Sequence, residues 1–414
     1  MMRWTPPVLF LSVFAVYYAS PVSIVVDSRW TLPTARSLLR ERNTDLDEYA
    51  DPGFDSDFRI ERVRNRHRAI YPVGTAVLAV PFVAAMETIG GRNVLADLPR
   101  SERFIASVIV ALAVVFLWFA VASSEGVGGA IASALLFAFA TSAWSTASRA
   151  LWQLGPSMLC LSIALWILVS ARKDPARVRF AALPLAFAFV VRPTGAIPAV
   201  VLTLYVLAEH RKWFWRFVLW GLPVPLALLA YNLAVYEALL PPYYLRPATY
   251  VPGWVAPQSM SSILGGFAGT LIAPSRGLFV YSPFLLLAAW GSMILRRRRD
   301  PLVPYLAAIF ILYWISISTW KMWWGGHSYG PRMMSEVVPF LIWLSAPVLG
   351  LAGKWAGLRR RLLIGGLVAL SLFSGVVHAR GAFSVAVWQW NHIPVSVDIA
   401  TRRLWDMRDA QFLR

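Results

Sequence analysis

The sequence predicts an all-α, polytopic membrane protein that forms a single membrane domain over residues 1–414. Hydrophobic residues make up 58% of the chain and charged residues only 14%, whereas soluble domains carry about 25% charged residues. Apolar runs long enough to span a bilayer recur along the whole sequence. The net charge of +18 comes from short basic clusters between these runs, which is the positive-inside pattern of membrane proteins and not a nucleic-acid-binding surface.

The apolar runs define the expected helices in order. The first run, at about 6–26, is long for a signal peptide and lacks a clear small-x-small cleavage site, so we expect an uncleaved helix. Residues 180–208 are interrupted by Arg192 and Pro193 and predict a hairpin of two short or tilted helices. The other runs lie at about 104–122, 129–147, 155–171, 217–236, 278–295, 302–319, 333–352 and 362–380. Together they predict about eleven transmembrane helices, within a range of about ten to thirteen.

Basic clusters between the runs predict the orientation. They are Arg172/Lys173/Arg177/Arg179, Arg211/Lys212/Arg216, Arg296–Arg299 and Lys354/Arg359/Arg360/Arg361. Two expected spans separate each cluster from the next, so all four lie on one side, which the positive-inside rule assigns to the cytoplasm. We therefore expect a protein of the cytoplasmic (inner) membrane with a cytoplasmic N-terminus.

The segment 71–90 decides the topology of the first loop. A span here would put the N-terminus outside and leave Arg3 on the wrong side. The prolines and Gly74 in this segment favour an interfacial or re-entrant helix instead. We therefore expect 27–103 to be one large extracytoplasmic loop with amphipathic interfacial helices. The other extracytoplasmic segments are then 237–277, 320–332 and the C-terminal tail 381–414.

Asp27 is the first acidic residue after the first expected helix. A carboxylate at the membrane surface, beside apolar chain, can serve as a general base. The alternative is structural, because the same carboxylate can cap the helix expected from Leu32 to Arg40. The sequence leaves both roles open.

A second acidic group, formed by Asp45, Asp47 and Glu48, lies in the same loop. Its hard oxygen ligands suit a divalent cation such as Mg or Mn, or they position an acceptor; the alternative is a solvated loop. The rest of the sequence offers little for a metal or nucleotide. Cys160 is the only cysteine, the five histidines form no His-x-x-x-His pair, and the chain has no P-loop and no G-x-G-x-x-G motif.

The segment 320–332 combines tryptophans, glycines and cationic residues. A membrane-interface belt explains the tryptophans, but it does not explain the glycines around Lys321, His327 and Arg332. Glycines allow close approach of the backbone to a ligand, and cationic donors suit a phosphate. The segment therefore predicts a phosphate-binding loop.

Three further arginines, Arg149, Arg192 and Arg276, lie at the outer ends of expected helices. Charges at such boundaries are costly and often functional, although each one alone can simply extend its head group to water. Because all three lie on the outer side, we expect them to contribute to phosphate binding.

Three features together resemble the GT-C superfamily of membrane glycosyltransferases, which includes protein O-mannosyltransferases and lipid A aminoarabinose transferases. Asp27 opens a long outer loop and precedes the amphipathic stretch 31–39. A Tyr-Pro-x-Gly element follows at 71–74, and the stretch 324–332 looks like one found in uncharacterised bacterial members.

The resemblance implies inverting transfer of a sugar from a polyprenyl-phosphate carrier to a glycan, lipid or protein acceptor at the extracytoplasmic face. Asp27 then takes the role of the base. The cations that would stabilise the leaving phosphate are Lys321, His327, Arg332, Arg149, Arg192 and Arg276. Asp27 is followed by Ser28 where many members have paired acids, which argues against direct metal binding at this position.

Two other classes of protein remain open. A lipid-linked sugar flippase or another transporter needs polar residues along a path through the membrane, and the expected spans contain few and show no inverted repeat. A structural subunit of an envelope assembly is favoured if Asp27 points into lipid or only caps a helix. Ionisable residues gathered in one outer cavity favour an enzyme.

Overall fold

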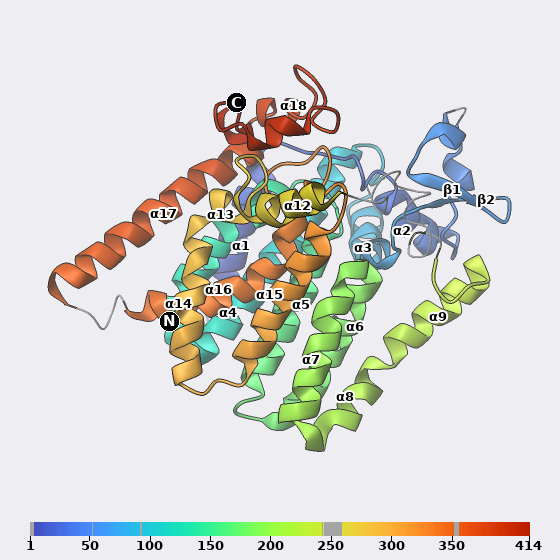
Figure 1. Ribbon diagram of the computed structural model, residues 1–414. Coiled ribbons are helices and arrows are strands. Elements are labelled where there is room, and N and C mark those ends of the chain that lie inside the picture. The colour runs from blue at the N-terminus through green and yellow to red at the C-terminus, as the bar shows by residue number, and fades with distance from the viewer. Residues whose placement is uncertain (1–3, 52, 92, 242, 244–258, 352–355) are drawn as a thin grey trace.

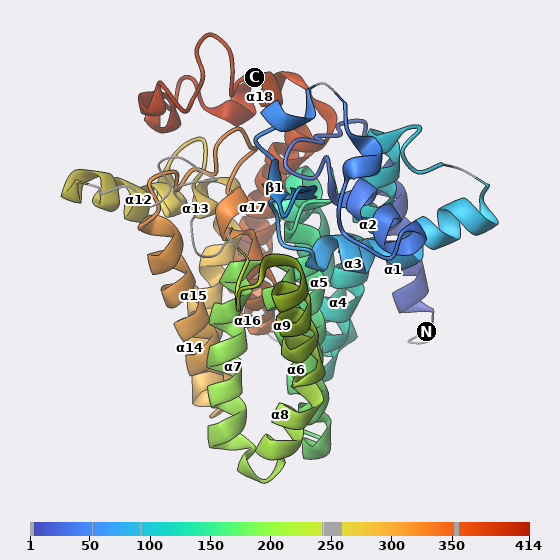
Figure 2. The same cartoon turned by 90° about the vertical axis from the view of Figure 1, so that its right-hand side faces the viewer.

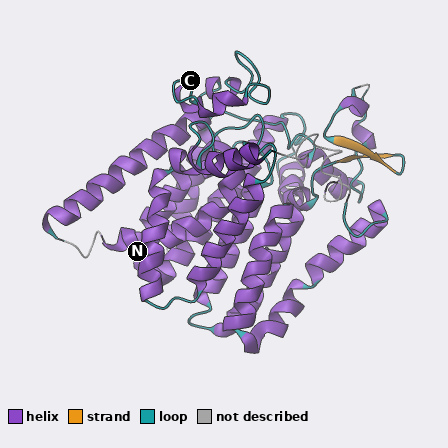
Figure 3. Cartoon of the chain, in the orientation of Figure 1, coloured by secondary structure: helices purple, strands orange, loops and turns teal. Residues whose placement is uncertain are grey.

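The computed structural model describes residues 4–51, 53–91, 93–241, 243, 259–351 and 356–414. Helices dominate this part of the chain (Figure 3). Long apolar helices form a bundle, and short helices and loops form a head at its upper end (Figure 1). The hairpin of β1 (Ile60–Val63) and β2 (Arg66–Ala69) is the only sheet among the described residues, a small departure from the expected all-α fold.

The helices follow the apolar runs of the sequence, with breaks where polar residues or prolines intervene. Their bounds are α1 Thr5–Ala19, α2 Thr31–Arg40, α3 Gly74–Ala84, α4 Leu98–Phe139, α5 Leu154–Ser170, α6 Ala182–Val191, α7 Ala196–Glu209, α8 Phe214–Gly221, α9 Pro223–Tyr236, α12 Met260–Ile272, α13 Leu278–Tyr281, α14 Leu287–Arg297, α15 Leu302–Ser318, α16 Val338–Leu351, α17 Gly357–Phe383 and α18 Ala386–Gln389.

The long helix α4 is two antiparallel helices joined at Gly126, where the backbone adopts φ 78° and ψ 174°. The guanidinium of Arg103 donates to the Pro21 carbonyl at 2.8 Å, and the Tyr17 hydroxyl donates to the Ala138 carbonyl at 2.7 Å. Both ends of α4 therefore lie beside the C-terminal end of α1. The chain descends through the bundle and returns, as the two apolar runs in this region predict.

The first loop leaves the bundle and returns to it at the same end. Ser23 Oγ donates to the Pro99 carbonyl at 3.0 Å, so the chain after α1 and the start of α4 are adjacent. Between them α3 packs along α2, and Arg36 of α2 pairs with Glu87 at 2.9 Å. This geometry supports the prediction that 71–90 does not cross the bilayer. In Figure 2, α2, α3 and β1 lie in the upper half of the molecule, far from the turn into α8.

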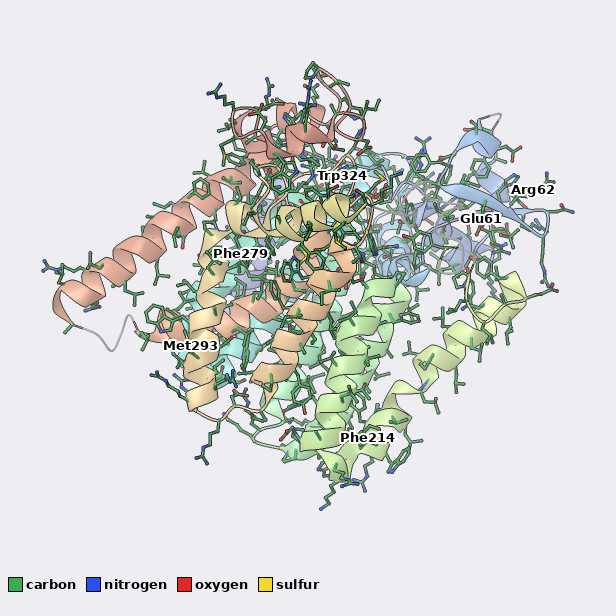
Figure 4. The ribbon with its side chains drawn as sticks, in the orientation of Figure 1. Glu61, Arg62, Phe214, Phe279, Met293 and Trp324 are labelled. Carbon is green, nitrogen blue, oxygen red and sulfur yellow. The ribbon has the colours of Figure 1, made fainter. Side chains whose placement is uncertain are left out.

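The opposite end of the bundle carries the basic clusters. Arg172, after α5, pairs with Asp300 at 2.5 Å, and Arg298 pairs with Glu125 beside the Gly126 turn. Phe214, at the start of α8, also lies at this lower end, whereas Trp324 lies in the head (Figure 4). The first three clusters thus gather at the end away from the head, whereas Lys354 of the fourth cluster lies outside the described residues.

Several expected spans are shorter or more broken than the sequence predicts. By length and composition, four helical segments of the described chain can cross a membrane: Leu98–Phe139, Arg211–Tyr236, Arg332–Leu351 and Arg360–Phe383. Other apolar helices, such as α1 and α15, are shorter. The run 217–236 is divided into α8 and α9, and the run 278–295 into α13 and α14. The expected count of about eleven transmembrane helices stays a prediction.

Two outer segments that the sequence predicts as loop and tail contain ordered helices. The helix α12 lies within 237–277 and runs across the head in Figure 1; residues 244–258 of this segment lie outside the described residues. In the tail 381–414, Arg403 donates to the carbonyls of Trp390, Val395 and Ile393 and thereby holds the tail in a compact fold.

Candidate active site

A cavity of about 700 Å³ opens in the head at the point where five segments of the chain meet. Its walls are residues of 26–31, 70–75, 151–154, 192–194 and 320–333, together with Phe58, Tyr243 and Asp398. Four residues that the sequence predicts for the site line this one cavity: Asp27, Arg192, His327 and Arg332. Segments distant in sequence therefore bring a carboxylate and several cations together.

Asp27 and Arg332 form an ion pair in the cavity wall. The side chains are partly exposed, at 24% for Asp27 and 19% for Arg332. The Arg332 guanidinium also lies 4.1 Å from the centre of the Trp152 ring, a cation–π contact that fixes its plane. Asp27 does not cap α2, because the N-cap position is Trp30 and no side chain caps this helix. Asp27 therefore does not have the helix-capping role that the sequence left open.

Glu102, near the start of α4, connects the two segments that carry Asp27 and Trp152. Its Oε2 accepts hydrogen bonds from Ser28 Oγ at 2.5 Å and from the Leu151 amide at 2.9 Å. Glu102 is fully buried, and its Oε1 has no hydrogen-bond partner among the described residues. The sequence analysis missed this carboxylate, which holds the chain on both sides of the Asp27–Arg332 pair.

Arg192 enters the cavity from the turn between α6 and α7. Its Nη1 donates to Glu336 Oε2 at 2.7 Å. The Tyr-Pro-x-Gly element lies beside this turn, because a Cβ on Gly74 would lie 2.5 Å from the Val190 carbonyl oxygen. Only glycine permits this approach of α3 to the end of α6. The close contact brings Tyr71 into the wall shared by Asp27 and Arg192.

Tyr71 is a neutral hydroxyl in this wall. Burial is the main cause that raises the pKa of Tyr71 well above its usual value, and the nearby Asp27 charge raises it further. The Tyr71 ring lies 5.9 Å from the Tyr243 ring. Because the hydroxyl stays protonated, it is available to donate a hydrogen bond to an oxygen of a ligand or of Asp27.

His327 is held in the cavity wall by the C-terminal tail. Its Nε2 lies 2.9 Å from Ser396 Oγ and 3.3 Å from Asp398 Oδ2, and its ring centre lies 4.2 Å from that of His392. Burial lowers the pKa of His327, while the Asp398 carboxylate acts to raise it. The Trp324 indole donates to Asp398 at 2.7 Å. The tail thus orders the 320–332 loop, and its Asp398 forms part of the cavity wall.

Three predicted phosphate ligands do not line the cavity. The Arg149 guanidinium is buried and donates to the Ser20 carbonyl at 2.9 Å, to the Tyr17 carbonyl at 2.5 Å and to Ser148. Lys321 is exposed. Direct phosphate binding by Arg149, Lys321 and Arg276 stays a prediction, and the placement of these residues does not support it.

The hydrogen bonds of Arg276 go to the protein itself and not to the cavity. It donates to the carbonyls of Trp324, at 3.0 Å, and Gly326, at 3.2 Å, and also to Gln411 and Asn391. These bonds join the 320–332 loop to the C-terminal tail. Arg276 therefore stabilises the loop that carries His327 and does not face the ligand space.

The acidic group of the first loop is spread over separate contacts. Asp47 binds Arg66 at 2.9 Å and His67 at 2.8 Å, Glu48 accepts from Ser37, and Asp45 is buried. None of the three acids lines the 700 Å³ cavity. In the described part of the chain, no group of three or more His, Cys, Asp or Glu residues has the geometry of a metal site. A divalent cation therefore stays a prediction without a ligand set.

The bundle of apolar helices is that of an integral membrane protein. Among solved structures, this chain is similar to ArnT from Cupriavidus metallidurans, whose crystal structure is bound to undecaprenyl phosphate. The likeness has a TM-score of 0.55, covers 98% of this chain and 73% of that chain, and has 15% sequence identity. No protein-family model matches the sequence, and no curated protein matches it. The shared feature is therefore the fold.

Proposed function

We propose that this protein is a membrane glycosyltransferase that moves a sugar from a polyprenyl-phosphate carrier to an acceptor at the extracytoplasmic face. The observation that carries the proposal is the Asp27–Arg332 pair in one large cavity of the head, with Arg192 in the same wall. The fold likeness to a protein whose crystal structure holds undecaprenyl phosphate supports a carrier of this kind.

The cations of the cavity suit the leaving group. When the bond between the sugar and the carrier breaks, negative charge develops on the phosphate, and fixed cations in a water-poor site stabilise it. Arg332 is oriented by the Trp152 ring and Arg192 by Glu336, so neither guanidinium has to reorganise during the reaction. An incoming phosphate competes with Asp27 for Arg332, which releases the carboxylate at the moment when the donor is bound.

Asp27 is the proposed base. The acceptor hydroxyl gives its proton to the Asp27 carboxylate, its oxygen bonds to the anomeric carbon from the face opposite the phosphate, and the polyprenyl phosphate leaves. One carboxylate is sufficient for this inverting displacement. The acceptor is a glycan, lipid or protein that reaches the cavity from the outer side, and the carrier chain lies in the surrounding lipid.

The rival function, transport of a lipid-linked sugar, predicts polar residues along a path through the bundle. The charged residues of the cavity wall instead gather in the head, which supports the enzyme. The test is turnover by the purified protein in nanodiscs, with polyprenyl-phosphate sugars as donors and an extract of membrane and envelope acceptors. Release of polyprenyl phosphate that depends on acceptor supports the proposal. Movement of intact donor across a liposome membrane, without its cleavage, would establish the transporter instead.

A further inference from the structure

Glu336 is a buried carboxylate on which four donors converge. Its Oε2 accepts hydrogen bonds from Arg192 at 2.7 Å, from Thr194 at 2.6 Å and from the Tyr313 hydroxyl. Its Oε1 accepts from Ser157. Glu336 and Tyr313 are each 1% exposed, so both carboxylate oxygens are saturated by side chains from α5, α15 and the α6–α7 turn.

This network lies directly behind the cavity wall. Arg192 and Thr194 line the cavity, whereas Glu336 does not. Among the described residues, the second guanidinium nitrogen of Arg192, Nη2, has only the weak acceptor Met333 Sδ, at 3.8 Å. The carboxylate thus holds one side of the guanidinium, and the strong acceptors of the network are all on the side away from the ligand space.

Burial of a charged pair is costly unless geometry and hydrogen bonds compensate for the lost water. At this site both oxygens of the Glu336 carboxylate accept hydrogen bonds, whereas Nη2 of the Arg192 guanidinium lacks a strong acceptor among the described residues. Arg149, in contrast, donates to two carbonyls and a hydroxyl and has strong acceptors around it. The difference indicates that Arg192 is held in place for a further acceptor that approaches from the cavity.

We propose that Glu336 is a positioning residue, which fixes the Arg192 guanidinium so that its remaining N–H groups face the phosphate of the carrier lipid. This inference rests on the proposed function, because it assumes that the cavity binds a polyprenyl phosphate. Thr194, Tyr313 and Ser157 act through Glu336 by locking the carboxylate in one orientation.

The sign of the effect separates positioning from simple electrostatics. A carboxylate 2.7 Å from Arg192 weakens the attraction of that arginine for a phosphate if charge alone matters. Neutralising Glu336 then tightens phosphate binding. If Glu336 positions Arg192, the same change weakens binding, because a neutral amide lacks the attraction between opposite charges that holds the guanidinium in place.

The experiment measures the dissociation constant of undecaprenyl phosphate for the full-length protein in detergent, for wild type, Glu336→Gln, Glu336→Asp and Arg192→Met. We expect each Glu336 variant to bind about tenfold more weakly, which is the lower end of what residues that orient the ligands of metal sites contribute. Glu336→Asp keeps the charge but shortens the side chain, so weaker binding by this variant reports the position of the carboxylate. Glu125→Gln is the matched control, since Glu125 also pairs with an arginine but lies at the opposite end of the bundle, and it should bind as wild type does.

Each outcome is decisive for one of the two proposals. Binding that is unchanged or tighter in both Glu336 variants, with Arg192→Met weakened, overturns the positioning role and leaves the proposed function intact. Wild-type binding in Arg192→Met, or no binding by wild type, counts against the phosphate site itself. If the Glu336 variants do not fold, Tyr313→Phe loosens the carboxylate without removing it; unchanged binding in that variant then contradicts the inference.

Discussion

Two pairs of arginines at the head of the bundle have opposite surroundings. Arg332 and Arg192 line the cavity, and each is paired with a carboxylate, Asp27 or Glu336. Arg149 and Arg276 are more deeply buried, and their guanidinium groups donate mainly to backbone carbonyls. The sequence gives no distinction between them, since all four lie at an end of an expected apolar helix, on the same expected side.

The partners explain what each pair can do. A buried carbonyl that accepts from an arginine would lose its hydrogen bond without that side chain, so the arginine stabilises the fold. An arginine paired with a carboxylate in an open wall can exchange part of its hydrogen bonding for a phosphate, which has the same charge and similar oxygens. We therefore infer that the first pair acts on ligand and the second pair stabilises the head.

The largest expected effect is that of Asp27→Asn. This change keeps the shape of the side chain and removes its charge, so transfer should fall by about 10²–10⁴, the usual cost of losing a general base. Sugar transfer by the purified variant, compared with Asp47→Asn as a control from the same loop, measures it. Transfer near the wild-type rate would remove Asp27 from this role.

Arg332→Met and Arg192→Met come next. Each removes charge-assisted hydrogen bonds to the proposed phosphate, so KM for the donor should rise about ten- to a hundredfold. Arg297→Met, an exposed arginine at the opposite end of the bundle, is the control. The comparison between the two pairs breaks if KM for the donor stays at the wild-type value in both cavity variants.

Arg149→Met and Arg276→Met should act on stability and leave KM unchanged. Removal of either guanidinium leaves buried carbonyls without a donor, at a cost of about 1–3 kcal/mol each. Thermal unfolding of the purified variants, followed together with KM for the donor, tests this division. A raised KM at an unchanged unfolding temperature would place these arginines with Arg332 and Arg192 after all.

The sequence predicted a helical membrane bundle, and it predicted that the segment 320–332 and the basic clusters lie at different ends of it, because both follow from local patterns. Apolar runs and basic clusters gave the bundle and its two ends, and the segment 320–332 led to His327 and Arg332. Partner choice did not follow in the same way. Arg149 contacts Tyr17 and Ser20, more than a hundred residues away along the chain, and no periodicity in the sequence encodes such a contact.

The two buried carboxylates, Glu102 and Glu336, were missed for a physical reason. Both lie at the outer end of an apolar run, where the sequence reads as the start of a membrane helix. An acidic residue inside such a run is costly and therefore informative, and this pattern is present in the sequence. What it does not contain is the partner, since Glu336 meets Arg192 and Tyr313 only through packing of separate helices.

The smallest expected effect concerns the charged contacts of the first loop, which lie outside the cavity. Hydrogen bonds from the His67 ring to the carboxylates of Asp47 and Asp55 raise the pKa of His67 above its ordinary 6.5, with burial opposing them. Burial acts to raise the pKa of Asp47, but hydrogen bonds from the His67 amide, Arg66 and the His67 ring lower it from 3.8 to about 2. Both groups are charged together between these limits.

The signs define a pH window for the β1–β2 hairpin. The His67 contribution is fully present below pH 6.5 and is lost as pH rises through its raised pKa, and the Asp47 contribution is lost as pH falls from 3.8 toward 2. Hydrogen exchange of the hairpin amides, corrected for the intrinsic rate at each pH, should therefore show less protection at pH 9 than at pH 6. Asp47→Asn should flatten this dependence, whereas donor binding at the cavity should not change in that variant. Protection that is independent of pH in the wild type would show that these contacts do not hold the hairpin, and a change in donor binding would show that the first loop and the cavity are coupled.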